Sequence, residues 1–391
     1  MKKIKIGPLE LNSDLILAPM MDVTTPSYIL TCRYFGGLGT FIYPMVFMNQ
    51  IVSAPKTIIP HMEFIEKTRP CGIQVCGNGR SIEIIKKSMD ILNSYNFDFL
   101  DINAGCPARH TCNSGGGASL LKPHRFNDFK NLISGVLKYS NKPVSVKIRI
   151  GWNSKDGLED ICKFIQDEGV SFLTIHARYA IQNYSGLVDL NIIKYIKSTL
   201  NIPVIGNGDV TNFIAYEIMK FQTKVDGVMI GRASQGNPRI FSEIDTLNEI
   251  ATQFKNDDLI LGELLKNFEK FNFPIHIKNS HKIDNIISIP ISKIKELDYY
   301  GDWREFFIFT NTIERIRENI KILLDNIEKL NEFWNNDKFK LLEIRRNLIW
   351  ILKGVSNSAS IRAKIANFKD LNSLLNYLNS NEIINDLEIK N

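Results

Sequence analysis

The first 245 residues of the chain contain eight short apolar segments, separated by stretches with helical spacing. The apolar segments predict β-strands at residues 15–19, 40–45, 72–75, 97–103, 144–150, 172–176, 203–206 and 227–230. Apolar residues recur every three or four positions between them, which predicts helices at residues 81–92, 127–139, 158–167, 191–200 and 212–221. Eight strand–helix units in about 245 residues predict a (β/α)8 TIM barrel, in the α/β class. The alternative is an open doubly wound sheet, which usually has fewer strands and an early Gly-x-Gly-x-x-Gly turn that we do not find here.

Polar residues alternate with aliphatic residues inside the predicted strands. In the fifth strand, Ser145, Lys147 and Arg149 share one face, and aliphatic residues share the other. The fourth and sixth strands carry Asn103 and His176 on polar faces in the same way. We expect the aliphatic faces to meet the helices and the polar faces to line the lumen and mouth of the barrel. Because buried polar groups are costly without partners, this convergence predicts a binding site.

The chain changes character after residue 245. Residues 246–300 are rich in Lys, Asn, Asp and Ile and lack clear periodicity, which predicts an insertion, a linker or loosely packed helices. Helical spacing returns at residues 302–335, 338–353, 360–366 and 370–378. We therefore expect a catalytic barrel domain over residues 1–245 and a small all-helical domain over residues 301–391.

The overall composition is typical of a globular protein. Hydrophobic residues make up 44% of the 391 residues, and the formal net charge of +6 is only a weak indication of an anionic partner. No run of about 18 apolar residues is present, so a membrane-spanning helix is not expected. The basic N-terminal residues are interrupted by Gly7 and Pro8, which does not fit a signal peptide, and a cytoplasmic location is expected.

The chain has six cysteines, and one of them stands at a predicted strand end. The spacings of Cys71 with Cys76 and of Cys106 with Cys112 do not fit a zinc site, so no metal site is predicted, and most of these thiols would be core residues. Cys106 follows a strand between Gly105 and a proline. The sequence leaves open whether it is a core thiol, a nucleophile or a general acid, although an ordinary cysteine is mostly protonated at neutral pH. The glycine run at residues 115–117 is either flexible or close-packed, and next to Cys106 it indicates a mobile lid.

Two turns with glycine follow the seventh and eighth predicted strands. The first contains Asn207, Gly208 and Asp209, and the second contains Gly231 and Arg232. Loops at these places often bind phosphate in TIM barrels, because glycine lets the backbone approach closely and arginine supplies a charged fork. Two ordinary turns are the alternative, and we favour a phosphate site.

Further residues at the predicted mouth suit a flat aromatic ligand. Pro19 and Met20 end the first strand, where their backbone could edge such a ligand. Gln74, Lys147 and His176 offer donors suited to the carbonyls and N1 region of a flavin ring. An inward lysine is hard to explain as a plain core residue.

At these positions the sequence resembles the tRNA-dihydrouridine synthases, FMN-dependent enzymes that reduce uridine in tRNA, and it is closest to their bacterial DusB-like branch. The clearest shared motif is Asn-Ala-Gly-Cys-Pro-Ala-Arg at residues 103–109. The other shared stretches lie at residues 17–20, 74–77, 146–152, 175–178, 184–186, 203–209, 231–233 and 236–238, and in the tail at residues 345–347, 350, 353–354 and 362. The chain departs from the family pattern at Asp22, at residues 43–45 and at Ala177. These departures concern the position of the substrate more than the chemistry.

The resemblance implies a reaction and a role for each matching residue. A hydride passes from N5 of the reduced flavin to C6 of uracil, Cys106 donates a proton to C5, and NADPH or NADH supplies the electrons. The isoalloxazine ring would be held by Pro19, Met20, Met21, Gln74, Lys147 and His176. The ribityl phosphate would be held by Asn207, Gly208, Asp209, Gly231 and Arg232. The target uridine or its phosphates would contact Asn103, Arg109 and Arg178. The helical domain would bind the tRNA body through Arg345, Arg346, Lys353, Arg362 and Lys364, and no membrane or obligate protein partner is implied.

Two other functions are compatible with parts of the sequence. A flavin-dependent dehydrogenase of a free pyrimidine would share the barrel, although a small substrate does not need a basic helical tail. A non-catalytic RNA-binding protein could retain the fold, although Cys106, Lys147, His176 and Arg232 are all present.

Overall fold

The computed structural model describes residues 4–253, 275–276, 308–309, 313–353, 355 and 357–388. The described residues divide into two units. The first contains the residues up to Met21 together with Leu38–Gly231, and the second contains Asp22–Gly37 together with the described residues from Arg232 onward.

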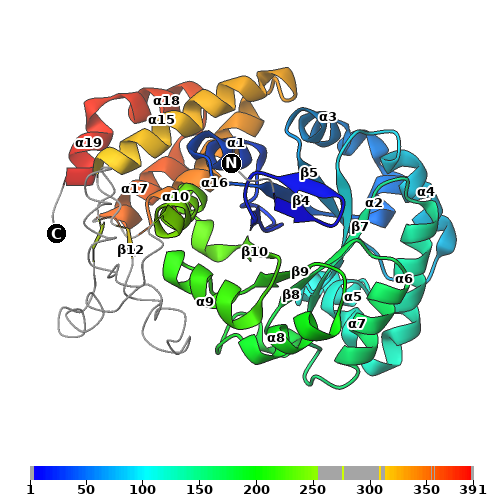
Figure 1. The fold of residues 1–391 in the computed structure, drawn as a ribbon. Coiled ribbons are helices and arrows are strands. Elements are labelled where there is room, and N and C mark those ends of the chain that lie inside the picture. Colours follow the sequence, from blue (N-terminus) through cyan, green and yellow to red (C-terminus); the bar gives the residue numbers. More distant parts are fainter. Residues whose placement is uncertain are drawn as a thin grey trace. The chain divides into compact units, whose positions relative to one another are not determined.

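Eight parallel strands form a closed barrel in the first unit (Figure 1). They are β3 (Leu15–Leu17), β4 (Thr40–Phe47), β5 (Cys71–Cys76), β6 (Phe99–Ala104), β7 (Val144–Arg149), β8 (Phe172–His176), β9 (Val204–Asn207) and β10 (Gly227–Ile230). Each strand pairs with the next in sequence, and β10 pairs with β3 to close the barrel. The predicted TIM barrel is therefore confirmed, and every predicted strand overlaps an observed one.

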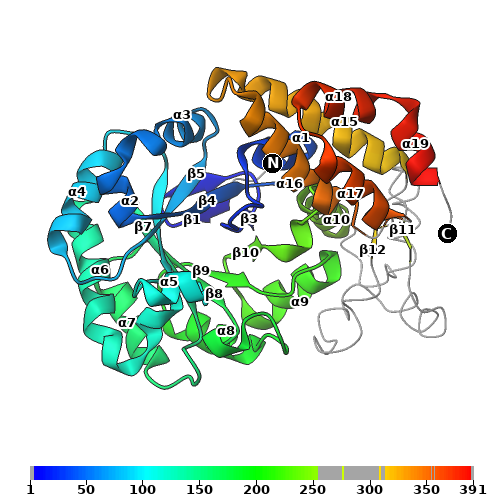
Figure 2. The ribbon, with the colours of Figure 1, turned by 180° about the vertical axis from the view of Figure 1, so that it is seen from behind.

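Helices surround the barrel strands, as Figures 1 and 2 show from opposite sides. They are α2 (Met48–Ser53), α3 (Ile59–Lys67), α4 (Ile82–Leu92), α5 (Arg109–Asn113), α6 (Phe126–Tyr139), α7 (Leu158–Asp167), α8 (Leu190–Thr199) and α9 (Phe213–Thr223). Three of them begin at side-chain caps, because Ser81, Asp189 and Asn212 each accept a hydrogen bond from a backbone N–H of the first turn. These helices include all five that the spacing predicts in this part of the chain.

The barrel interior is apolar toward one end. Its apolar side chains belong to several different strands, and they include Ile16, Ile42, Phe99, Phe172, Ile205 and Met229. A hairpin of β1 (Ile4–Ile6) and β2 (Leu9–Leu11) packs Ile6, Leu9 and Leu11 against this cluster. The hairpin is missed by the sequence patterns because each strand has only three residues. Apolar side chains fill this end of the barrel. A polar site can therefore lie only at the opposite end, where the strands finish.

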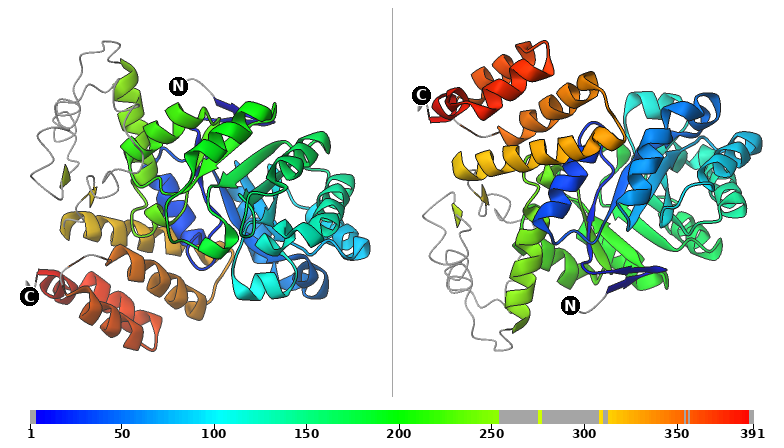
Figure 3. Two further views of the ribbon diagram at one scale, coloured as in Figure 1. Left: turned by 90° about the horizontal axis from the view of Figure 1, so that it is seen from below. Right: turned by 90° about the horizontal axis from the view of Figure 1, so that it is seen from above.

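The second unit is mainly helical (Figure 3). It contains α1 (Pro26–Phe35), α10 (Ile240–Gln253), α15 (Ile313–Lys329), α16 (Asp337–Ile351), α17 (Ser358–Asn367), α18 (Leu371–Asn379) and α19 (Asn381–Glu388). Its core includes Leu323, Ile344, Leu348 and Leu374, all fully buried. The expected C-terminal helical region is therefore present, and α19 is an addition that the patterns did not predict.

Two predictions for this region need correction or fall outside the described residues. The helix predicted over residues 302–335 is wrong at its start, because Ile308–Phe309 form strand β12, which pairs with β11 (Ile275–His276). Most of the predicted linker, residues 246–300, lies outside the described residues, and residues 246–253 belong to α10. No helix in the described part of the chain has both the length and the apolar character that crossing a membrane requires.

Candidate active site

Polar side chains gather where the barrel strands end. Gln74, Asn103, Lys147, His176 and Asn207 come from the last residues of five consecutive strands, β5 to β9. The strand register places Asn103 beside Lys147 and His176 beside Asn207. The structure thus brings together the residues that the alternating pattern directed to the lumen. In TIM barrels the catalytic residues lie at this end.

A chain of hydrogen bonds links the interior of the barrel to Cys106. The amide nitrogen of Gln74 donates to Oδ2 of Asp101 at 2.7 Å, and its amide oxygen accepts from Nδ2 of Asn103 at 2.7 Å. Oδ1 of Asn103 in turn accepts from the backbone N–H groups of Gly105 and Cys106, at 3.1 and 2.9 Å. Because an ionised carboxylate only accepts, Asp101 fixes the direction of both amides. The backbone at Cys106 is therefore held by a directed series of contacts.

Asp101 begins this chain as a fully buried carboxyl group. Burial raises the pKa of Asp101 to about 6, against the lowering effect of hydrogen bonds from Ser145 and Gln74. The Ser145 hydroxyl donates to Oδ1 at 2.7 Å, so each carboxylate oxygen has a donor. The sequence analysis did not include Asp101 among the site residues, although it shares a strand face with Asn103.

Lys147 is a cation inside the barrel. Its Nζ donates to Oδ1 of Asn207 at 3.0 Å, and Nδ2 of Asn207 donates to the carbonyl of Met229 at 2.8 Å. Burial, and after it the nearby Arg149 guanidinium, lower the pKa of Lys147 to about 8. A partly buried ammonium with a depressed pKa is costly for stability, which marks this position as a candidate for function.

Cys106 lies half-buried on the turn after β6. Its Sγ is 3.5 Å from the Thr111 hydroxyl, and its carbonyl accepts from the N–H of Ala118 at 2.9 Å. Gly117 has a φ of +57°, and a Cβ there would stand 2.6 Å from the Cys106 carbonyl oxygen. The glycines of this run are buried, so the run is close-packed and the expected mobile lid is wrong.

The other cysteines are packing residues or neighbours of this turn. Cys32, Cys71, Cys76 and Cys162 are buried, which confirms their interpretation as core thiols. Burial raises the pKa of Cys76 and of Cys162 to about 12. All six cysteines are free, and the described residues contain no group of three or more His, Cys, Asp or Glu placed to hold a metal ion.

Arg149 is a site residue that the sequence analysis did not select. It is buried at the end of β7, where Nε donates to the Gly105 carbonyl at 3.0 Å and Nη1 donates to the Tyr179 carbonyl at 2.9 Å. It therefore joins the turn that carries Cys106 to the loop after β8. The sequence could have identified Arg149 as a site residue, because it lies two residues after Lys147 on the same strand face.

Arg178 and Asp209 form a buried ion pair. Nη2 of Arg178 is 2.6 Å from Oδ2 of Asp209, and Arg178 is 1% exposed. The same guanidinium donates to the carbonyls of Ser185 and Gly186 and lies 3.3 Å from Nε2 of His176. The sequence analysis expected Arg178 at the substrate and Asp209 at a phosphate, and the structure brings the two side chains into direct contact.

The remaining barrel residues from the sequence analysis lie at strand ends or on exposed turns. Pro19 and Met20 are half-buried after β3, and Met21 is 56% exposed. A Cβ at Gly231, just after β10, would be 3.6 Å from Sδ of Met20, so these two strand ends are adjacent. Arg109 is exposed at the start of α5. Gly208 follows β9 with a φ of +131°, and Arg232 begins the second unit.

The basic residues of the helical unit differ in their contacts. Arg346 pairs with Asp22 at 2.9 Å, which gives the unusual Asp22 a partner. Arg345 donates to the Phe368 carbonyl. Lys364 binds Glu382 and Asp386, whereas Lys353 is exposed and Arg362 is half-exposed. Lys353 lies over the ring of Trp350, with Nζ 5.9 Å from its centroid.

Comparisons with known proteins agree with this geometry. The family model described as Dihydrouridine synthase (Dus) matches residues 16–269. The tRNA-dihydrouridine synthase B of Xanthomonas campestris pv. campestris is 32% identical over 245 residues, which cover 62% of this chain and 71% of that protein. A probable tRNA-dihydrouridine synthase of Aquifex aeolicus is 36% identical over 260 residues, which cover 65% of this chain and 79% of that protein. Histamine dehydrogenase from Rhizobium sp. 4-9 has a TM-score of 0.50 at 12% identity, covering 64% of this chain and 48% of that one, and this likeness concerns the fold alone. The sequence matches confirm the resemblance drawn from the motifs.

Proposed function

Because the chain belongs to the dihydrouridine synthase family of flavin-dependent oxidoreductases, we propose that it reduces the C5=C6 bond of uridine in tRNA, with FMN as cofactor and NADPH or NADH as electron donor. The observation that carries the proposal is the placement of a partly buried cation, Lys147, and a half-buried thiol, Cys106, at the end of the barrel where the strands finish.

The polar groups at the strand ends fit a flavin ring. Gln74, Lys147 and His176 offer amide, ammonium and imidazole groups, which suit the carbonyl and nitrogen edge of an isoalloxazine. Lys147 would offset the negative charge that reduction places near N1. This gives a reason to keep an ammonium ion where burial disfavours it. Bound FMN would supply the hydride that reaches C6 of the uracil.

Cys106 would supply the proton. Hydride addition at C6 places negative charge on C5 and the C4 carbonyl as an enolate, so C5 must gain a proton to complete the reduction. Cys106 would donate its Sγ proton to C5, and general acid help of this kind is typically worth about 10²–10⁴-fold. Asn103 and Arg149 would keep the thiol in place, since they hold the backbone N–H of Cys106 and the carbonyl of Gly105.

The remaining assignments follow from position and are part of the proposal. Pro19, Met20 and Met21 would edge the ring, and the ribityl phosphate would meet the backbone of residues 207–209 and 231–232. We assign Arg178 an indirect role, since protein acceptors occupy its guanidinium and it would orient His176 and Asp209. Asn103 and Arg109 would meet the uridine and its phosphates. The expected helical domain, residues 301–391, would bind the tRNA body, and a cytoplasmic location stays a prediction.

The direct test is nucleoside mass spectrometry of unmodified tRNA after incubation with the purified protein, FMN and NADPH. Dihydrouridine should form with the wild type and be lost with Cys106→Ala. Cys112→Ala removes a neighbouring half-buried thiol and should leave the reaction intact, as a matched control. Full turnover by Cys106→Ala would refute its role as the acid. Reduction of free uracil but of no tRNA would favour the free-pyrimidine dehydrogenase.

A further inference from the structure

A cavity of about 260 Å³ lies beside the turn that carries Cys106. Four segments of the first unit line it, namely the start of α2 with the residue before it, the loop between β5 and α4, the first turn of α4, and the residue after α5. The volume is below the roughly 300–1,000 Å³ typical of pockets for drug-sized ligands. It therefore suits a smaller group, of the size of one nucleobase. The proposed reaction assigns this cavity no role.

The lining combines an apolar floor with polar edges. Phe47, Met48 and Ile85 form apolar surface, and the Phe47 ring packs edge-on against His110 with centroids 5.4 Å apart. Asn78 and Ser114 also line the cavity. Oδ1 of Asn78 accepts from the Arg80 N–H and the Ser114 hydroxyl donates to the Thr111 carbonyl, and both oxygens keep a lone pair for a further donor. An aromatic surface beside hydrogen-bonding edges is how proteins recognise an unstacked RNA base.

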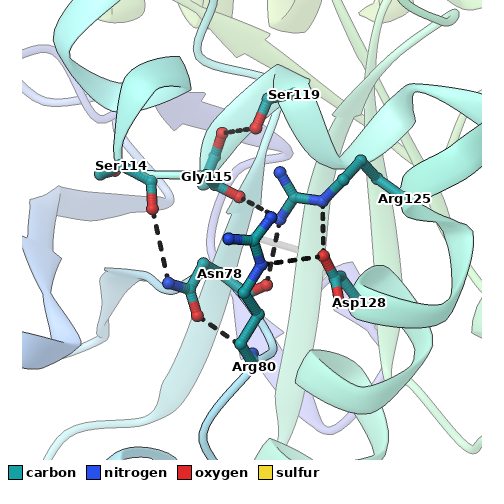
Figure 4. A network of polar contacts seen from close by, with 8 residues as sticks. Asn78, Arg80, Ser114, Gly115, Ser119, Arg125 and Asp128 are labelled. Carbon is teal, nitrogen blue, oxygen red and sulfur yellow. Dashed lines mark hydrogen bonds and ion pairs between the residues drawn. The ribbon is translucent and has the colours of Figure 1, made fainter.

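The polar side of the cavity is held in a fixed shape (Figure 4). Nη2 of Arg125 donates to the carbonyls of Gly115 and Asn78, at 2.9 and 3.3 Å, and so ties together the loops that follow β5 and β6. Gly79 has a φ of +73°, and a Cβ there would stand 1.8 Å from the Asp128 carbonyl oxygen. The cavity is therefore shaped before any ligand arrives, which lowers the cost of binding.

The same side carries excess positive charge. Arg80 and Arg125 share one carboxylate, Asp128, with Nε atoms 3.3 and 2.5 Å from its Oδ2. Arg80 is 61% exposed, and its contact with Asp128 is made through Nε. A planar guanidinium at the rim of a cavity is well suited to a phosphate.

The cavity borders the glycine run that packs against the Cys106 turn. Cys76 lines the cavity, and a Cβ at Gly116 would stand 2.6 Å from its Sγ. The next residue, Gly117, approaches the Cys106 carbonyl equally closely. The cavity and the Cys106 turn are therefore neighbours through Cys76 and residues 116–117, which is why we consider the same RNA as its ligand.

We propose that this cavity, with Phe47, Asn78, Arg80 and Ser114, binds the base and phosphate of one unpaired nucleotide next to the uridine that is reduced. The inference rests on the proposed function, because it identifies a second subsite for the same RNA. The apolar floor favours a base over a phosphate alone, and Arg80 favours a nucleotide over a neutral ring.

The experiment pairs protein variants with altered RNA. Once mass spectrometry has located the reduced uridine, tRNA transcripts are made with one abasic residue at each neighbouring position in turn. Asn49→Trp fills the cavity from an exposed lining position without changing charge, and Arg80→Gln removes the rim charge. Lys163→Gln is the control, because it removes an equally exposed charge, paired with Glu159, on α7. Affinity for each transcript and the rate of flavin reduction by NADPH are measured for every protein.

The wild type should lose about fivefold or more in affinity at one abasic position. Asn49→Trp should bind intact tRNA more weakly by a similar factor and be insensitive to that abasic position. Arg80→Gln should weaken all transcripts about equally and reduce the salt slope of binding by about one, whereas Lys163→Gln should not. Flavin reduction should be unchanged throughout.

Two results would count against the inference, and they are distinguishable. The subsite is refuted, and the proposed function stands, if dihydrouridine forms but two measurements show no change. These are the loss of affinity at each abasic position, which would be the same in the wild type and Asn49→Trp, and the salt slope of Arg80→Gln, which would equal that of the wild type. If no tRNA yields dihydrouridine with any of these proteins, the proposed function itself fails and the inference falls with it.

Discussion

The ammonium nitrogen of Lys147 lies 3.0 Å from Oδ1 of Asn207, across two strands of the barrel. The contact fixes the asparagine amide, because its Nδ2 must then donate to the Met229 carbonyl, as observed at 2.8 Å. One cation thereby orders the ends of β7 and β9, two of the strands at which we place the flavin.

The first prediction concerns the charge of Lys147. Burial lowers its pKa to about 8, so Lys147 is protonated below that pH and loses its charge as the pH rises through it. If the cation supports the reduced flavin, the rate of flavin reduction by NADPH should fall as the pH rises through about 8. Lys147→Gln should be slower and lack this dependence. Stopped-flow absorbance of the flavin measures both.

Cys106→Ala serves as the control for this pH profile. Flavin reduction precedes the proton transfer to uracil, so this variant should keep the wild-type dependence on pH. If Lys147→Gln retains the same fall near pH 8, another group is responsible for it.

The second prediction concerns the buried Asp101. Burial raises its pKa to about 6, so between about pH 4 and pH 6 the folded protein holds a proton that the unfolded chain has released. This contribution to stability is greatest below pH 4 and is lost as the pH rises to about 6, a difference of about 3 kcal/mol. The melting temperature of Asp101→Asn relative to the wild type should therefore rise from pH 4 to pH 6 and stay level above pH 7. If the difference in melting temperature between Asp101→Asn and the wild type is the same at every pH in this range, the interpretation is refuted.

The barrel could be predicted because its strands carry a simple alternation. The fifth predicted strand separates aliphatic residues from Ser145, Lys147 and Arg149, and the structure places these three polar side chains together inside the barrel. The short hairpin strands give no such signal, since three residues are too few to show a period. They belong to the apolar core only because the barrel presents a surface for them to cover.

The contacts of the site were harder to predict than its members. Arg178 and Asp209 are 31 residues apart in sequence, and nothing local indicates that they pair. The glycine run at residues 115–117 was compatible with either mobility or close packing. It is close-packed because Cys76, Cys106 and the loop after β5 all lie against it. Tertiary neighbours therefore decided what the local sequence left open.

The third prediction tests this close packing. Gly117 and Gly157 both have positive φ, at +57° and +73°, but a Cβ at Gly117 meets the Cys106 carbonyl oxygen and one at Gly157 meets nothing within 4 Å. Both alanine variants carry the backbone strain, of order 1–3 kcal/mol, and only Gly117→Ala adds the steric clash. We expect Gly117→Ala to have the lower melting temperature and, uniquely, to lose dihydrouridine formation. Equal effects in the two variants would show that the turn at Cys106 can relax.

The fourth prediction separates the basic residues of the helical unit by their existing partners. Lys364 already binds Glu382 and Asp386, whereas Lys353 is exposed and Arg362 is half-exposed. A basic residue that binds RNA phosphate releases counterions, so its loss reduces the salt dependence of binding. Lys353→Gln and Arg362→Gln should each weaken tRNA binding and lower the salt slope by about one, as measured by fluorescence anisotropy between low and moderate salt. Lys364→Gln should leave the slope unchanged, because its charge is neutralised within the protein. A reduced slope for Lys364→Gln, with none for the other two, would place the RNA on a different face of the helical unit.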